Sequence, residues 1–112
     1  MDNIRSTSAL VPLVAAATPL TLFPVGTGRS AKIKKIMTYN GQPADVILEI
    51  GTGLAPFVRT MPRIRLISTF HDNIGEFDLP EIEFTANITC QASAAGAGVL
   101  SVEVQVEVEV IG

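Results

Sequence analysis

The side chains best suited to chemistry fall within one short segment, and they are His71, Asp72, Glu76 and Asp78. Their nitrogen and oxygen atoms could hold a hard cation, but their spacing does not match the calcium-loop pattern. A metal enzyme of the jelly-roll type needs several histidines converging from neighbouring strands, and His71 is the only histidine in the chain. We therefore expect this segment to be a solvated or subunit-contacting loop that binds no metal.

A second chemical candidate is Cys90, the only cysteine. It falls on the apolar face of a predicted strand and has no basic neighbour in the sequence, which favours a small buried hydrophobe over a nucleophile. The glycine pairs at 26–28 and 51–53 lack the third glycine and the following helix of a dinucleotide-binding fingerprint, so they predict turns. The sequence therefore predicts a protein that is not an enzyme and that carries no cofactor.

Length and composition narrow the class of partner. A chain of 112 residues predicts one domain with a core of its own. The net charge of -3 gives no general attraction to nucleic acid or to an anionic membrane. One tyrosine and no tryptophan leave few aromatic faces for stacking on single-stranded nucleic acid. We expect neither nucleic acid nor a membrane as a partner.

The clearest structural signal is the last dozen residues. Every even position from Leu100 to Val110 is apolar, and the odd positions hold Ser101, Glu103, Gln105, Glu107 and Glu109. A period of two predicts a β-strand with one buried and one solvated face. So long a half-apolar strand needs partner strands beside it and a second apolar layer over its valines.

Shorter segments repeat this alternation, and we expect strands at 31–39, 45–50, 57–61, 63–70 and 82–92, with Ile64, Leu66 and Phe70 on a buried face. Lys34 and Lys35 interrupt the alternation, which predicts a bulge or a shift of face. Asn40–Gly41 predicts a hairpin that joins the first two of these strands. The segment 82–92, which we expect to bend near Ala86, is the natural antiparallel partner of the last strand through the loop 93–98. The intervening residues 71–80 are predicted to form a polar loop.

Residues 6–28 carry no charge. Their apolar part, 9–17, resembles the core of a secretory signal, but the residues before it have no net positive charge, and Pro12, Pro19 and Pro24 interrupt any helix. Prolines suit an extended arm or edge strands, with short strands at 11–15 and 20–23. We therefore expect an extended N-terminal arm at 1–25, a sandwich at 26–112, and no secretion by a signal peptide.

Together these segments give about seven to eight strands and no segment with a helical period. They predict an all-β fold, an antiparallel β-sandwich of jelly-roll or immunoglobulin-like topology, with an extended N-terminal arm.

Charge is divided unevenly along the chain. All eight basic residues lie at or before Arg65, where the net charge is +5, and residues 66–112 have a net charge of -8. Two interpretations stay open: ion pairs across strands within one subunit, or complementary patches that join neighbouring subunits.

The order of features resembles small β-sandwich virion proteins of tailed phages, especially head decoration (cement) proteins. The features are the extended apolar arm, the lysine-rich strand, the Asn40–Gly41 turn before residues 45–51, the turn at 79–81, the small-residue loop and the final Val/Glu strand. This resemblance implies a homo-oligomer, with a trimer favoured, on the capsid surface of a virion. It implies the major capsid protein or another assembly subunit as the partner, contacted by the arm.

On this hypothesis the assembly interface combines the apolar residues of the arm with the charged faces of two strands. The candidates are Ile4, Leu10, Val11, Leu13, Leu20, Leu22, Phe23, Lys32, Lys34, Lys35, Glu103, Glu107 and Glu109. The alternative function is a carbohydrate- or ligand-binding β-sandwich module. The absence of tryptophan and the single tyrosine weigh against it, because sugar-binding platforms use aromatic faces.

Overall fold

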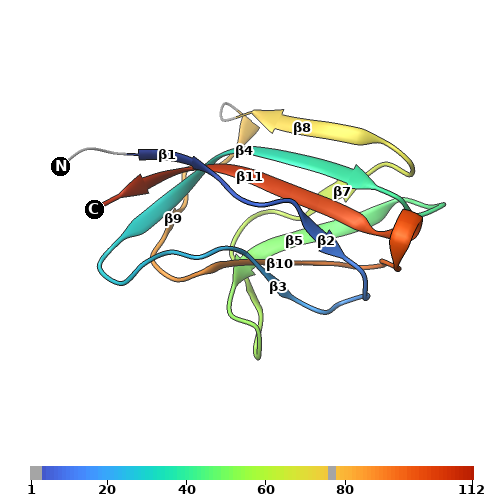
Figure 1. The fold of residues 1–112 in the computed structure, drawn as a ribbon, viewed down its shortest axis with the longest axis horizontal. Helices are drawn as coiled ribbons and strands as arrows, with labels where there is room; N and C mark the ends of the chain where they lie inside the picture. The colour runs from blue at the N-terminus through green and yellow to red at the C-terminus, as the bar shows by residue number, and fades with distance from the viewer. Residues whose placement is uncertain (1–3, 76–77) are drawn as a thin grey trace.

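A computed structural model describes residues 4–75 and 78–112 and shows two antiparallel sheets packed face to face (Figure 1). The first, called here the β11 sheet, contains β1 (Ile4–Thr7), β2 (Val11–Leu13), β4 (Ser30–Asn40), β8 (His71–Gly75), β9 (Glu83–Phe84) and β11 (Val102–Ile111). The second, the β10 sheet, contains β3 (Leu20–Phe23), β5 (Val46–Thr52), β6 (Val58–Arg59), β7 (Ile64–Leu66) and β10 (Ile88–Ala92). The predicted all-β sandwich is confirmed.

These eleven described strands form eight longer ones, because three of the eight are interrupted. Both β1 and β2 pair with β11, both β8 and β9 pair with the same strand β4, and both β6 and β7 pair with β5. Counted this way, the first strand pairs with the eighth, the second with the seventh, the third with the sixth and the fourth with the fifth. This nested pairing of a long hairpin rolled into two sheets is the jelly-roll topology.

The last strand lies at the centre of its sheet, between β1 and β2 on one side and β4 on the other. Its valines Val102, Val104, Val106 and Val108 are fully buried, as the period of two predicted. They pack against the inner residues of the β10 sheet, including Leu48, Ile50 and Ile88. Leu100 is an exception to the predicted pattern, since it belongs to a short 3₁₀ helix, Gly98–Leu100, and is exposed.

The bulge predicted from the Lys34–Lys35 pair is confirmed. Glu107 pairs with Lys35, and the next residue of β11, Val108, pairs with Ile33, so Lys34 is the extra residue. The extra residue lets Ile33 and Ile36 both point into the core. The strand thereby keeps its buried face on both sides of the interruption.

The predicted pairing of residues 82–92 with the last strand is wrong. The segment breaks at residues 85–87, near the expected bend: β9 stays in the β11 sheet beside β4, while β10 enters the other sheet between β3 and β5. Asn87 accounts for part of the break, because its Oδ1 accepts a hydrogen bond from Val25 N at 2.9 Å. The loop at 93–101 therefore crosses between sheets.

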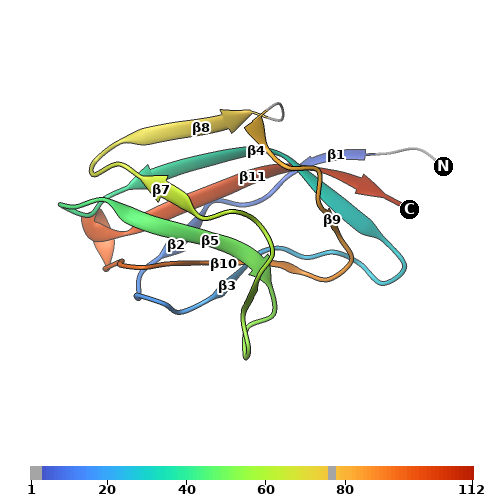
Figure 2. The ribbon, with the colours of Figure 1, turned by 180° about the vertical axis from the view of Figure 1, so that it is seen from behind.

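The predicted hairpin at Asn40–Gly41 is also wrong, since β4 and β5 lie in different sheets (Figure 2). The side chain of Asn40 is buried and donates to the carbonyl oxygens of Ala44 and Leu66, both at 3.0 Å. A Cβ at position 41 would collide with the carbonyl oxygens of Val99 and Ser101. Asn40–Gly41 therefore forms a corner where the chain passes from one sheet to the other. This corner needs a buried side-chain amide at position 40 and a residue without a Cβ at position 41.

The predicted polar loop at 71–80 contains an edge strand instead. Backbone pairing of β8 with β4 from Lys35↔Gly75 to Tyr39↔His71 holds it in place, although only Ile74 of its side chains is partly buried. Residue 76 of the proposed cation set lies outside the described residues.

The segment predicted as an arm supplies strands to both sheets. Ser8 joins β1 and β2 to the sheet: its N–H donates to Val106 O at 2.8 Å, and its Oγ accepts from Val106 N at 3.0 Å. The side chains of Leu13 and Leu22 are 1% and 3% exposed and belong to the core. These two residues are therefore committed to the fold of their own subunit.

Candidate functional site

The sequence singled out two candidates for chemistry, a set of cation ligands and Cys90. The described residues contain no cluster of three or more His, Cys, Asp or Glu side chains able to hold a metal ion. Cys90 is fully buried, and burial raises the pKa of its thiol to about 12, so it is the small core residue that the sequence predicted. Within the described ranges, no helix is long and apolar enough to cross a membrane.

Charged side chains alternate in rows across the outer face of the β11 sheet. Glu109 pairs in register with Arg5 on one side and Lys32 on the other, and Glu107 lies between Thr7 and Lys35. Arg5 Nη1 donates to Glu107 Oε1 at 2.8 Å. The basic first part and the acidic second part of the chain therefore meet within one subunit along these rows.

The bulge adds a second link between the two halves. Lys34 Nζ lies 3.9 Å from Glu81 Oε1, and the lysine side chain is mostly buried whereas the glutamate is mostly exposed. Both links fit the interpretation of ion pairing within a subunit. An exposed pair such as Arg5–Glu107 typically contributes about 1 kcal/mol or less to stability, so it sets register more than it drives folding.

The outer face of the β10 sheet carries a compact polar network. Asp45 accepts hydrogen bonds from the backbone N–H of Ser68 and from Arg65, and these hold the pKa of its carboxyl below the ordinary value. Glu49 accepts from Gln91 at 2.9 Å and from Arg63 at 3.1 Å, and the same bonds lower the pKa of Glu49. The described carboxylates of this face are thus matched by donors.

This network predicts a pH dependence of stability. The ordinary pKa values of Asp45 and Glu49 are 3.8 and 4.5, and folding lowers both, so their contribution is complete above these values and is lost as pH falls through the folded-state values. We expect the urea midpoint of the protein to drop between about pH 6 and pH 3 by more than that of Glu49→Gln. Equal drops in both proteins would show that the Glu49 contacts contribute nothing to folding.

The apolar residues predicted for the interface divide into three groups. Leu13 and Leu22 are buried, Val11 and Phe23 pack partly buried against the core, and the exposed ones are Ile4, Leu10 and Leu20. Exposed fractions of 61%, 52% and 39% for Ile4, Leu10 and Leu20 leave these three side chains available to a neighbouring molecule.

One end of the sandwich is unusually apolar, and the sequence did not predict it. Four connections meet there: 14–19, 41–45, 67–70 and 93–101 (Figures 1 and 2). Their only charged residue is Asp45, which is paired with Arg65. Their exposed large apolar side chains are Val14, Ile67, Phe70, Val99 and Leu100, with Val99 86% exposed. We call this surface the apolar end; it includes Phe70, which was expected in the core.

Hydrogen bonds tie these connections together. Gln42 Nε2 donates to Leu100 O at 2.5 Å, Ser68 Oγ donates to Gln42 O at 2.7 Å, and Asn40 N donates to Phe70 O at 3.3 Å. These hydrogen bonds fix the connections relative to one another. The apolar side chains are therefore held in defined positions. Asp45, the last residue of the connection 41–45, is already paired with Arg65.

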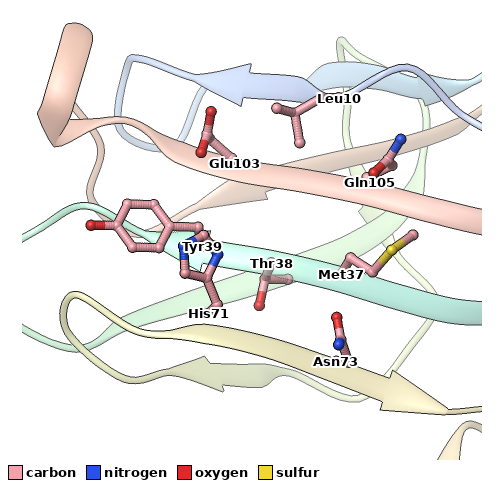
Figure 3. A pocket seen from close by; sticks show the side chains of 8 residues that line it. All are labelled: Leu10, Met37, Thr38, Tyr39, His71, Asn73, Glu103 and Gln105. Carbon is pink, nitrogen blue, oxygen red and sulfur yellow. The ribbon is translucent and has the colours of Figure 1, made fainter.

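A shallow depression of about 220 Å³ lies on the outer face of the β11 sheet (Figure 3). Its lining residues are Leu10, Met37, Thr38, Tyr39, His71, Asn73, Glu103 and Gln105, and we call it the Tyr39 depression. The rings of Tyr39 and His71 are stacked at a tilt of 33°, with centroids 4.3 Å apart. Of the candidate residues predicted from sequence, this depression brings together Leu10 and Glu103.

Comparison with solved structures shows a likeness in fold. A chain in the crystal structure of the T13 IBDV viral particle matches 96% of this chain with a TM-score of 0.50 at 10% sequence identity. The two chains share a fold. The present chain spans about 30% of the length of that viral-particle chain. No family model and no curated protein matches the sequence.

Proposed function

We propose that this chain is a non-enzymatic structural component of a virion, whose copies associate through the apolar end. The observation that carries this proposal is the grouping of five exposed large apolar side chains on a surface whose one charged residue, Asp45, is already paired with Arg65. Large contiguous apolar patches on a folded domain mark interaction sites. A jelly-roll fold shared with a viral-particle chain supports the choice of assembly, although the same fold also serves lectins and enzymes.

A second copy is the partner that best fits the charge distribution. Two chains that each carry -3 repel one another over most of their surfaces. Residues near a symmetry axis face their own copies, so a charge there would meet a like charge. The apolar end carries a single charged residue, Asp45, which Arg65 already pairs, and depletion of charge is typical of the centre of an interface.

The expected strength of this contact is modest. Burying the exposed half of a large apolar side chain contributes roughly 1 kcal/mol. Ten such side chains from two copies give on the order of 10 kcal/mol, and bringing two molecules together offsets about 4 kcal/mol or more of it, so association is measurable at high protein concentration. A single pairwise contact is therefore weak, and the surface suits an assembly in which several contacts act at once.

The remaining exposed candidates suit contact with other subunits. Ile4 lies on β1 and Leu20 begins β3, and both would meet the major capsid protein or another assembly subunit. Lys32, Lys35 and Glu109 lie on the outer face of the β11 sheet, where exposed charge can steer a partner into register. The resemblance to head decoration proteins favours a trimer at the capsid surface.

Replacing Val99 with aspartate tests this proposal. Val99 is 86% exposed, so the substitution should leave the fold intact while placing a charge at the contact. We expect the association constant measured by sedimentation velocity to fall roughly tenfold or more. The matched control is Leu54→Asp in the connection between β5 and β6, because Leu54 is 52% exposed but lies away from the apolar end. Equal association of both variants and the parent would locate the contact elsewhere.

A further inference from the structure

The Tyr39 depression is built as a grid of outward-facing side chains from three strands. In one row, strand pairing places Tyr39 between Glu103 of β11 and His71 of β8. In the next row it places Met37 between Gln105 and Asn73. Leu10, between β1 and β2, closes the side next to Glu103 and Gln105 (Figure 3). An aromatic and apolar floor is thus bordered by polar groups.

Most polar side-chain groups that line the depression make no hydrogen bond or ion pair with other described residues. Among the described residues, no side-chain hydrogen bond or ion pair engages the Glu103 carboxylate, the Asn73 amide, the Tyr39 hydroxyl or the His71 ring nitrogens. Gln105 donates its Nε2 to Ser8 O at 3.0 Å and keeps its Oε1. The polar side chains around Glu49 and Asp45 on the other sheet, by contrast, bond to one another.

These features limit the chemistry of a ligand. An aromatic face favours a partner with an apolar ring face or C–H groups. Carboxylate and amide oxygens beside it accept hydrogen bonds, and the Asn73 amide also donates one, so a ring with several hydroxyl groups satisfies both. The negative charge of Glu103 disfavours phosphates and acidic sugars. The volume is below the usual range for drug-sized ligands and suits one small ring.

We propose that the Tyr39 depression is a binding site for a neutral saccharide, with one sugar ring placed against Tyr39 and its hydroxyl groups bonded by Glu103, Asn73 and Gln105. The site is complete within one chain, so it does not depend on the proposed assembly. A shallow site for a single ring predicts weak binding, with a dissociation constant on the order of 1 mM for one chain. Repetition of the chain on a particle would raise the effective affinity.

The test is titration of the ¹⁵N-labelled full chain with methyl glycosides of glucose, galactose and mannose, followed by NMR amide shifts. We expect at least one glycoside to shift amides of β4, β8 and β11 around the depression. Methyl β-glucuronide serves as an acidic probe, which should shift these amides less than the neutral glycosides do, and arginine methyl ester serves as a cationic probe. Absence of shifts with all three neutral glycosides, or shifts with the cationic probe alone, would overturn the proposal.

Substitutions of Tyr39 distinguish the contribution of its ring from that of its hydroxyl group. A control substitution outside the depression tests whether the effects are specific to the site. Tyr39→Ala should weaken glycoside binding roughly tenfold, while Tyr39→Phe keeps the ring and should stay within about threefold. Glu103→Gln should weaken binding roughly fivefold because a charged acceptor becomes a neutral one. Glu109→Gln removes a glutamate from the same face of the same strand outside the depression and should have no effect. Unchanged binding in Tyr39→Ala would overturn the proposed site.

Discussion

Replacing Val106 with aspartate should prevent the chain from folding. Val106 is fully buried at the centre of β11, where it pairs with Ile36 and where Ser8 bonds to its backbone on the other side. An unpaired carboxylate at this point would lose its hydration without gaining a partner. The cost should exceed about 4 kcal/mol, a large part of the stability of a domain of this size. Far-UV circular dichroism and soluble yield measure the outcome.

The matched control is Glu109→Asp, which places the same side chain on the outer face of the same strand. This variant should fold with near-normal stability, because surface substitutions change the free energy of unfolding by about 0.5 kcal/mol or less. A soluble, folded Val106→Asp protein at parental yield would show that the assignment of the two faces of β11 is wrong.

The second large effect is expected at Asn40. Its Nδ2 donates to two carbonyl oxygens, and its Oδ1 accepts from Gln42 N at 2.8 Å, all from a fully buried side chain. Asn40→Ala leaves these backbone groups without partners and opens a small cavity, so the free energy of unfolding should fall by about 2–4 kcal/mol. Urea denaturation measures this change.

Two further variants show whether the loss of stability in Asn40→Ala comes from the hydrogen bonds of its buried amide. Asn87→Ala removes one side-chain hydrogen bond, to Val25 N, at an exposed site and should cost about 1 kcal/mol or less. Asn40→Asp keeps the acceptor for Gln42 N but turns an oxygen toward the carbonyls of Ala44 and Leu66, so it should destabilise at least as much as alanine. Equal, small effects at Asn40 and Asn87 would contradict the role of Asn40 as the corner of the two sheets.

Much of the fold could be predicted because alternation reports which face of a strand is buried. The valines of β11, the inner face of β5 and the bulge at Lys34 all follow from a period of two and its interruption. Alternation does not report which strand lies beside which. Residues 82–92 were therefore paired with the wrong partner, since a jelly roll sends most consecutive strands to opposite sheets.

Other features depend on tertiary context that the sequence does not display. β8 has one partly buried residue, Ile74, so no pattern marked it as a strand; its pairing with β4 comes from the backbone. Phe70 and Leu100 continue an alternating pattern, yet each falls beyond the end of the paired strand and is exposed. A useful signal was present, because the four connections of the apolar end contain only one charged residue, Asp45.

The sequence predicted some of the candidate surfaces and not others, because the position of a surface residue also depends on tertiary context. The charged rows follow from the lysines of β4 and the glutamates of β11, and register then places them side by side. The Tyr39 depression requires the register of β11, β4 and β8 together, including one strand that the sequence did not predict. Leu13 and Leu22 are apolar like Leu10 and Leu20, and only the fold separates buried from exposed members of this set.

Sedimentation velocity of the unmodified chain, over a range of concentrations at low and at high salt, tests the association of copies through the apolar end most directly. Apolar contact predicts oligomers that grow with protein concentration and persist or strengthen at high salt, since salt screens charge but does not weaken apolar burial. A protein that stays monomeric at every concentration, or oligomers that dissociate as salt rises, would contradict this account.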